Sequence, residues 1–167
     1  MIPLRFLVFD VDGVFTDGSI RYDDRGIESK VFHVRDGLAV RLAREAGLLV
    51  GVLTGRNSAC VALRVREMGI HHAMHGVDDK GRGIADLCAA AGVTPELTAY
   101  MGDDLIDLPA MRRCAYAMTV ADGAPEVRRA AHFITQAPGG RAAVREAIEH
   151  VLRGQGLWDR AIERFLA

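Results

Sequence analysis

The sequence predicts an α/β protein with a doubly wound, mainly parallel, Rossmann-like sheet, one projecting β-hairpin and no cap domain. Short apolar runs alternate along the chain with segments whose apolar residues recur at helical spacing, an order typical of parallel sheets covered by helices. The runs show no polar alternation, as expected of strands buried on both faces. The length of 167 residues fits one domain, so we expect a single domain over residues 1–167.

The expected strands follow the apolar runs in chain order. They are Phe6–Phe9, Leu48–Leu53, Leu97–Met101, Ala115–Met118 and His132–Ile134. Helices are expected between strands, because apolar residues recur at helical spacing in 38–46, 61–68 and 84–88. A further helix is expected at 141–152, after Gly139 and Gly140, whose backbone freedom would let the C-terminal tail bend.

One segment interrupts this alternation and predicts the hairpin. Residues 19–22 and 28–33 have strand-like sequences and flank a turn-like stretch at 23–26, so a β-hairpin is expected at about 19–33. A lone two-stranded hairpin is only marginally stable, and we expect it to pack on another surface, such as a second subunit. The C-terminal tail, at about 153–167, carries an apolar helical stripe that also needs a partner. The stripe consists of Trp158, Ile162, Phe165 and Leu166.

Composition excludes several classes of function. The 21 basic and 22 acidic residues give a net charge of −1, so there is no basic field to attract nucleic acid or an anionic membrane. No apolar stretch is long enough to span a bilayer. The 3 cysteines are widely spaced, which favours reduced thiols in a cytoplasmic protein. We therefore expect a cytoplasmic protein that binds neither nucleic acid nor membrane and holds any anionic ligand locally.

Polar side chains stand where the predicted strands end. They are Asp10 and Asp12, Thr54 and Arg56, and Asp103, Asp104 and Asp107, joined by Lys80 at the start of a helix. In open parallel sheets the carboxyl ends of the strands form the ligand crevice. Residues scattered over almost the first two thirds of the chain are therefore expected to converge on one site.

The residue types in this group favour a particular chemistry. Carboxylates gathered at one edge repel one another unless a cation neutralises them. Oxygen ligands favour Mg²⁺, and the absence of histidine or cysteine from the group disfavours zinc. A magnesium ion, a lysine and a threonine hydroxyl together suit a phosphoryl group. His71, His72 and His75 are disfavoured as a second metal site, because alternating positions near a short strand point to opposite faces.

Four ordered motifs carry a resemblance to a known superfamily. They are Asp10-Val-Asp12-Gly-Val with Thr16-Asp17-Gly18, Thr54-Gly-Arg, Lys80, and Gly102-Asp103-Asp104-Leu-Ile-Asp107. In order and spacing they resemble the motifs of the haloacid dehalogenase superfamily of phosphatases. Over nearly the whole chain, the stretches DVDGVFTDG, FHVRDG, YMGDDLIDLP, GGRAAVRE and GQGLWD resemble the 3-deoxy-D-manno-octulosonate 8-phosphate phosphatase family, whose members lack a cap domain and form tetramers.

The resemblance implies a Mg²⁺-dependent phosphatase that hydrolyses this small anionic sugar phosphate in lipopolysaccharide precursor synthesis. It implies that Asp10 attacks phosphorus to form an aspartyl-phosphate, and that Asp12 acts as general acid and then as general base. The implied metal ligands are Asp10, Asp103 and the backbone carbonyl of Asp12. The implied assembly is a homotetramer in which hairpins pack together and a neighbour's tail reaches the site.

The remaining polar residues have implied supporting roles. Thr54 would hydrogen-bond a phosphoryl oxygen, and Lys80 would bind the same group as a point charge. Asp107, and with it Asp104, would not bind the metal directly but would orient Lys80 or metal-bound water.

Three arginines are candidates for binding the sugar acid. Arg56 is placed to clamp a carboxylate through two hydrogen bonds, and relatives that act on a nine-carbon sugar acid phosphate carry an acidic residue there, which favours the eight-carbon substrate. Arg64, on the following helix, would either assist or pair with Glu67 or Asp86. Arg141 is expected to meet the bound anion from an adjacent subunit.

The sequence is compatible with three alternative interpretations of substrate or function. The chain departs from its relatives at His33, Ala39 and His75, where Asn, Gly and Gln are common, so a nonulosonate 9-phosphate or another sugar phosphate is an alternative substrate. A receiver-like signalling module also holds an aspartyl-phosphate with Mg²⁺, Thr and Lys, but its acceptor follows the middle strand, where this chain has Thr54. A non-catalytic scaffold is a third interpretation, which the presence of every catalytic residue disfavours.

Overall fold

A computed structural model of the chain describes residues 3–166 and confirms the predicted fold class. Six strands form one sheet in the order β5-β4-β1-β6-β7-β8, and every pairing in it is parallel. The strands are β1 (Phe6–Phe9), β4 (Leu49–Leu53), β5 (His72–Met74), β6 (Thr98–Met101), β7 (Tyr116–Thr119) and β8 (Phe133–Ile134). The chain winds from β1 out to β5 and then returns to β6, so the winding reverses between β1 and β6. Ligand crevices of open α/β sheets lie at this point.

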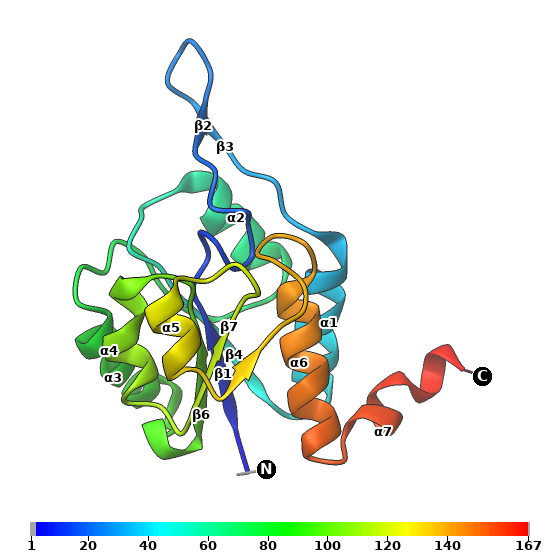
Figure 1. Cartoon of the computed structure of the whole chain (residues 1–167). Coiled ribbons are helices and arrows are strands. Elements are labelled where there is room, and N and C mark those ends of the chain that lie inside the picture. The colour runs from blue at the N-terminus through cyan, green and yellow to red at the C-terminus, as the bar shows by residue number, and fades with distance from the viewer. Residues whose placement is uncertain (1–2, 167) are drawn as a thin grey trace.

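Two layers of helices cover the sheet (Figure 1). Side chains of α1 (Val34–Glu45), α2 (Ala59–Glu67) and α6 (Ala143–Gly154) pack in one core. Side chains of α3 (Lys80–Ala91), α4 (Leu108–Met111) and α5 (Pro125–Ala130) pack in the other. Leu7 and Phe9 join the first core while Phe6 and Val8 join the second, because successive strand residues point to opposite faces. Burial on both sides therefore explains why β1 is uniformly apolar.

Short 3₁₀ turns and one short strand complete the connections. The turns are η1 (Pro95–Leu97), η2 (Leu105–Asp107) and η3 (Glu163–Phe165). The short strand expected near the three histidines is β5, at one edge of the sheet. Within residues 3–166, no helix combines the length and apolar character needed to cross a membrane.

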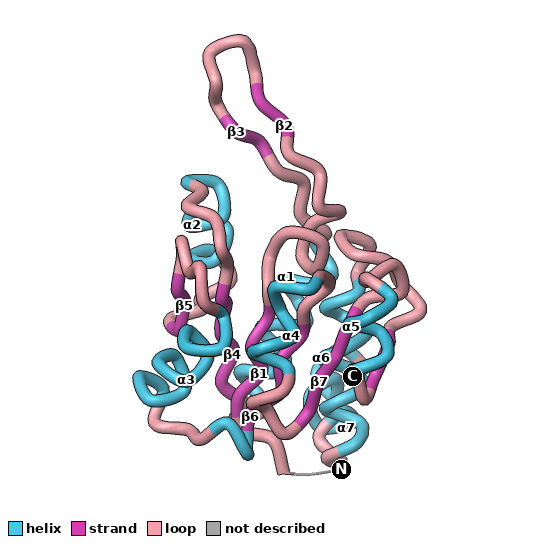
Figure 2. Tube along the Cα trace, turned by 60° about the vertical axis from the view of Figure 1, so that its left-hand side comes forward, coloured by secondary structure: helices cyan, strands magenta, loops and turns pink. Residues whose placement is uncertain are grey.

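The expected hairpin is present and projects from the body of the molecule (Figure 2). Its strands, β2 (Arg21–Tyr22) and β3 (Glu28–Ser29), pair in antiparallel fashion, and each is shorter than the sequence predicted. The Asp23 carboxylate closes the turn by accepting hydrogen bonds from the amides of Arg25 at 3.0 Å and Ile27 at 2.8 Å. The hairpin leaves four large apolar side chains half exposed or more, namely Ile20, Tyr22, Ile27 and Val31.

The apolar stripe predicted for the tail is divided between two environments. A helix, α7 (Trp158–Ile162), is followed by the turn η3 rather than by a continuous helix to residue 166. Trp158 is only 6% exposed, whereas Phe165 and Leu166 are 51% and 76% exposed. The first part of the stripe therefore belongs to the core, and the last part faces outwards.

Gly139 and Gly140 serve close packing as well as backbone freedom, since Gly140 has a φ of +69°. A Cβ on Gly139 would lie 1.9 Å from the carbonyl oxygen of Gly13. The amide of Gly140 donates to the carbonyl of Val14 at 3.0 Å. The loop before α6 is thereby pressed against the loop after β1, where the candidate site lies.

Two of the three departures expected from the resemblance lie at α1, His33 just before its first residue and Ala39 within it. His33 is the N-cap of this helix, and its Nδ1 accepts a hydrogen bond from the amide of Arg35 at 3.3 Å. Asparagine caps helices in the same way, so the exchange preserves the local function. Ala39 is fully buried in the core.

The N-terminus of α6 is capped by a residue from α1. Ala142, at the N-cap position, offers no side-chain acceptor, and Asp36 instead accepts a hydrogen bond from the amide of Arg145 at 2.8 Å. The carboxylate is 1% exposed and its Oδ2 has no hydrogen-bond partner. Burial, opposed by the amide of Arg145 and nearby arginine charges, raises the pKa of Asp36 to about 6.

Substitutions at Asp36 separate the capping role from the cost of its charge. Because its pKa lies above the ordinary value of 3.8, the folded state binds more protons than the unfolded state between about pH 4 and pH 6, and the free energy of unfolding falls as pH rises through that window. Asp36→Asn keeps an acceptor for Arg145, so it should remove this part of the pH dependence and be at least as stable as the parent at about pH 8. Asp36→Ala should lose about 1–2 kcal/mol with the cap.

Urea unfolding between about pH 4.5 and pH 8 measures both effects. Asp24→Ala, at the exposed tip of the hairpin, is the control and should unfold like the parent. Equal destabilisation by the Asn and Ala variants at pH 8 would contradict the capping role.

Candidate active site

The carboxyl ends of β1, β4 and β6 bring the predicted polar residues to one cavity of about 230 Å³. The cavity is lined by Asp10, Asp12, Gly18, Thr54, Gly55, Arg56, Lys80, Asp103, Asp104 and Ile106. Asp107 lies behind it and is fully buried. The predicted convergence of residues from distant parts of the chain is therefore present in the fold.

The loop after β1 is folded tightly over the site. The amide of Asp10 continues the sheet by donating to Met101 at 2.9 Å, and the next turn folds back onto the carbonyl of Val11, which accepts from the amides of residues 14–16. Gly13 has a φ of +85°, and a Cβ there would lie 2.0 Å from the Asp103 carboxylate. Glycine is required at this position both for the backbone conformation and for the approach of Asp103.

Lys80 brings a buried positive charge into the cluster of carboxylates. It is the first residue of α3, and only 2% of it is exposed. Its Nζ lies 2.6 Å from Asp107 Oδ1 and 2.9 Å from Asp10 Oδ1. Burial opposes the charged form, but the two carboxylates outweigh it and raise the pKa of Lys80. The side chain is therefore a permanent cation between two acids.

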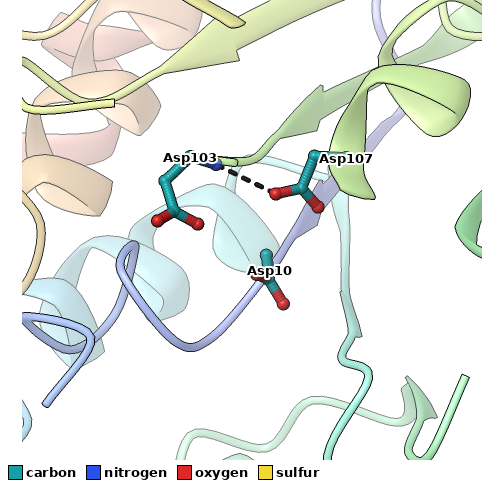
Figure 3. Close-up of side chains that lie close together, drawn as sticks. All are labelled: Asp10, Asp103 and Asp107. Carbon is teal, nitrogen blue, oxygen red and sulfur yellow. Dashed lines mark hydrogen bonds between the residues drawn. The ribbon is translucent and has the colours of Figure 1, made fainter. Parts of the chain in front are cut away.

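Asp107 is fully occupied as a hydrogen-bond acceptor. Its Oδ1 accepts from Lys80 and from the hydroxyl of Tyr100 at 2.7 Å. Its Oδ2 accepts from the amides of Asp103 at 3.0 Å and Asp104 at 3.2 Å, and Figure 3 shows the first of these two bonds. A carboxylate has about four acceptor positions, so Asp107 has none left for a metal. It fixes Lys80 and the loop that carries Asp103.

Asp10 and Asp103 keep free oxygens and face a cation-binding position. Ligand oxygens of Asp10, Asp103 and Asp107 lie within 4.8 Å of one another. Figure 3 shows these three side chains gathered in one place. Asp10 Oδ1 is buried without a hydrogen bond, because the approach of Lys80 at 2.9 Å has ion-pair rather than hydrogen-bond geometry.

The electrostatics of the cluster fit a divalent cation. Burial, with the charge of Asp107, raises the pKa of Asp10, although Lys80 opposes the rise. Burial, with the charges of Asp10 and Asp107, raises the pKa of Asp103 to about 7. Three carboxylates face one ammonium, so negative charge is in excess, and hard oxygen ligands of this kind suit Mg²⁺.

Polar residues that the sequence pattern does not predict, Lys30 and Glu28 of the hairpin, reach residues of the site. Asp12 accepts a hydrogen bond from Lys30, whose side chain is fully buried, and Glu28 accepts hydrogen bonds from Arg56 and Ser58. In each of these contacts, the two residues are separated by 18 to 30 positions in the sequence. No local sequence pattern predicts such contacts, because charged residues on an exposed hairpin are usually solvated.

The three candidate arginines lie in different places. Arg56 lines the cavity. Arg64 pairs with Glu67 at 3.3 Å and lies over the ring of Phe32, which is the alternative contact expected for it. Arg141 is exposed and, like Arg64, is not among the residues of segment 3–166 that line the cavity. Within one chain, only Arg56 of these three therefore adjoins the site.

The chain matches a family model and is similar to known relatives along most of its length. Residues 53–148 match the family model of haloacid dehalogenase-like hydrolases, so the chain belongs to this class of hydrolase. The chain is 41% identical over 153 residues to the 3-deoxy-D-manno-octulosonate 8-phosphate phosphatase of Haemophilus influenzae, covering 92% of this chain and 85% of that protein. It is 40% identical over 158 residues to the Escherichia coli K12 phosphatase, covering 95% and 84%.

The fold of this chain also matches a solved structure along nearly the whole length of both chains. The crystal structure of the phosphatase from Moraxella catarrhalis, in complex with a magnesium ion, a phosphate ion and a KDO molecule, has a TM-score of 0.95 at 37% identity and covers 98% of this chain and 94% of that one. The chain therefore belongs to the 3-deoxy-D-manno-octulosonate 8-phosphate phosphatase family.

Magnesium should stabilise the folded chain through Asp103. Addition of about 10 mM Mg²⁺ should raise the thermal unfolding midpoint. The rise should be larger at about pH 8 than at about pH 6, because the Asp103 carboxyl, with a pKa of about 7 in the metal-free chain, must lose its proton to bind the ion. Differential scanning calorimetry measures the shift.

Asp103→Asn and Asp104→Asn form a matched pair for this measurement. The first should abolish the shift. The second should keep most of it, because the Asp104 carboxylate is exposed and accepts from the amide of Leu105 at 2.7 Å, a bond that asparagine can also form. A full shift in Asp103→Asn would show that the metal binds elsewhere.

Proposed function

We propose that this chain is a Mg²⁺-dependent phosphatase that hydrolyses 3-deoxy-D-manno-octulosonate 8-phosphate to the free sugar acid and phosphate. It acts through an aspartyl-phosphate, in the cytoplasm, in lipopolysaccharide precursor synthesis. The observation that carries the reaction class is the position of Asp10 and Asp103 beside Lys80 and Thr54 at one end of the sheet. The substrate is supported by the family to which the chain belongs and by the KDO molecule in the Moraxella catarrhalis complex.

Thr54 and Lys80 bind the phosphoryl group in this proposal. Thr54 is almost fully buried, and its Oγ accepts a hydrogen bond from the amide of Arg56 at 3.3 Å, so its own hydrogen remains free to donate to a phosphoryl oxygen. The Lys80 ammonium, held by Asp107, balances the charge that accumulates when a phosphate dianion approaches Asp10. Both groups are fixed before the substrate binds.

The side chains of Asp10 and Asp103, with the backbone carbonyl of Asp12, would hold Mg²⁺. When bound, the ion neutralises negative charge on the transferring phosphoryl group. Asp107 and Asp104 support these ligands without binding the ion themselves. Asp107 accepts a hydrogen bond from Lys80, and Asp104 caps η2.

Asp10 and Asp12 carry out the two chemical steps. A carboxylate oxygen of Asp10 forms a bond to phosphorus as the bond from phosphorus to the sugar oxygen breaks, and Asp12 gives its proton to that leaving oxygen. Asp12 then takes a proton from a water molecule, whose oxygen attacks phosphorus. The bond between phosphorus and Asp10 breaks, which releases phosphate and restores both carboxyl groups.

Arg56 binds the carboxylate of the sugar acid, because it lines the cavity and its guanidinium matches a carboxylate in geometry and charge. Arg64 and Arg141 are the further candidates for the anion. For Arg64 this requires release from Glu67, to which it is now paired. For Arg141 it requires an approach from an adjacent subunit.

A phosphatase panel tests the proposal. Release of phosphate should depend on Mg²⁺ and be fastest with the octulosonate 8-phosphate, compared with nonulosonate 9-phosphates and common sugar phosphates. Asp10→Asn should lower kcat by about a thousandfold or more, because the nucleophile is lost, while its circular dichroism and melting behaviour remain those of a folded chain. Equal rates across the panel would refute the substrate but not the reaction class.

The receiver-like alternative makes a different prediction for the same protein. A receiver incubated with a small phosphodonor accumulates a long-lived acyl phosphate and releases little phosphate. A phosphatase turns the donor over many times. Stoichiometric labelling without turnover would therefore refute the enzyme.

We also propose that the chain is one domain and assembles as a homotetramer, with the hairpins packed together and each tail reaching a neighbouring site. The exposed apolar side chains of the hairpin and of the tail support this assembly, since such patches usually mark contact surfaces. Native mass spectrometry should give the mass of four 18.1 kDa chains, and Ile27→Glu should dissociate them. A monomer in the parent protein would refute this arrangement.

A further inference from the structure

Glu28, at the base of the hairpin, makes several contacts with the loop that follows β4. Its Oε1 accepts a hydrogen bond from Nη2 of Arg56 at 2.8 Å, and its Oε2 accepts one from the hydroxyl of Ser58. Lys30 lies 3.5 Å from Oε1. The same Nη2 of Arg56 also donates to the hydroxyl of Tyr22 at 3.0 Å. The hairpin thus accepts two hydrogen bonds from Nη2 of the Arg56 guanidinium.

Part of the Arg56 guanidinium is left without a protein partner. Its Nε is buried and makes no hydrogen bond, and it lies 4.0 Å from Asp12 Oδ2, too far for one. A buried donor without an acceptor is costly. Because Arg56 lines the cavity, a bound carboxylate can accept hydrogen bonds from the guanidinium N–H groups that the hairpin leaves unpaired.

We propose that Glu28 is a positioning residue for substrate selection, which holds Arg56 by its Nη2 so that the remaining N–H groups of the guanidinium face the carboxylate of the substrate. This inference rests on the proposed function, because it needs a substrate that carries a carboxylate besides its phosphate. The hydrogen bond from Ser58, with the hydrogen bond and charge of Arg56, lowers the pKa of Glu28 to about 2, so the negative charge that holds Arg56 is present at every working pH.

A competing role for Glu28 makes the opposite prediction. If its carboxylate merely occupied Arg56 until the substrate displaced it, removing Glu28 would free the arginine and lower KM. If Glu28 orients Arg56, removing it lets the long side chain turn away from the cavity, and KM rises. The direction of the change in KM therefore decides between the two roles.

The test compares two esters, the octulosonate 8-phosphate and p-nitrophenyl phosphate, which carries no carboxylate. Glu28→Ala should raise KM for the first by about tenfold, the size of one lost charge-assisted contact, while changing kcat little. KM for p-nitrophenyl phosphate should not move. Glu28→Gln keeps an acceptor for Arg56 and should recover most of the loss.

Two further variants test whether the effect passes through Arg56. In an Arg56→Ala background, Glu28→Ala should cause no additional rise in KM, because coupled residues are not additive. Asp23→Ala disturbs the turn of the same hairpin, through the bonds to Arg25 and Ile27, without touching Arg56. It should leave KM for both esters unchanged.

The outcomes separate this inference from the proposed function. If the parent enzyme shows no preference for the octulosonate ester, the proposed substrate fails. If the parent has that preference, the role of Glu28 is overturned by any of three results: a lower or unchanged KM in Glu28→Ala, an equal change with both esters, or full additivity with Arg56→Ala.

Discussion

A single buried ammonium holds the candidate site together. Lys80 lies between Asp10, which follows β1, and Asp107, which follows β6. Without that charge, the carboxylates at this end of the sheet would repel one another and take up protons. Asp107, held in this way, binds the backbone amides of Asp103 and Asp104. The positions of Asp10, the proposed nucleophile, and of Asp103, a proposed metal ligand, therefore both depend on one lysine at the start of a helix.

The site lies where the topology of the sheet requires it. The winding of the chain reverses between β1 and β6, and the helices that connect the strands leave a crevice at the carboxyl ends there. Because the crevice lies at the carboxyl ends of the strands, polar residues that directly follow strands are expected to meet there. This explains why Asp10, Thr54, Lys80 and Asp103 were predictable as a group from the sequence. Each follows a strand or begins a helix, so knowing the order of the elements was enough to bring them together.

Contacts outside this rule were not predictable. The burial of Lys30 and the pairing of Glu28 with Arg56 depend on the direction in which the hairpin leaves the sheet, and a sequence of alternating charges does not encode that direction. The capping of α6 by Asp36 joins residues 109 positions apart. The sequence predicts backbone freedom at Gly139. It does not predict the close contact of Gly139 with Gly13, because that contact depends on how two distant loops pack together.

The packing around Gly13 links three loops. The Asp103 carboxylate lies against one side of this glycine, and Gly139 packs on its carbonyl oxygen. Gly13 and Gly139 have no side chain to shorten, and shortening Asp103 would remove a proposed metal ligand. An engineer who wishes to transplant the loop after β1 into another scaffold, or to exchange it with that of a distant homologue, must therefore move all three loops together.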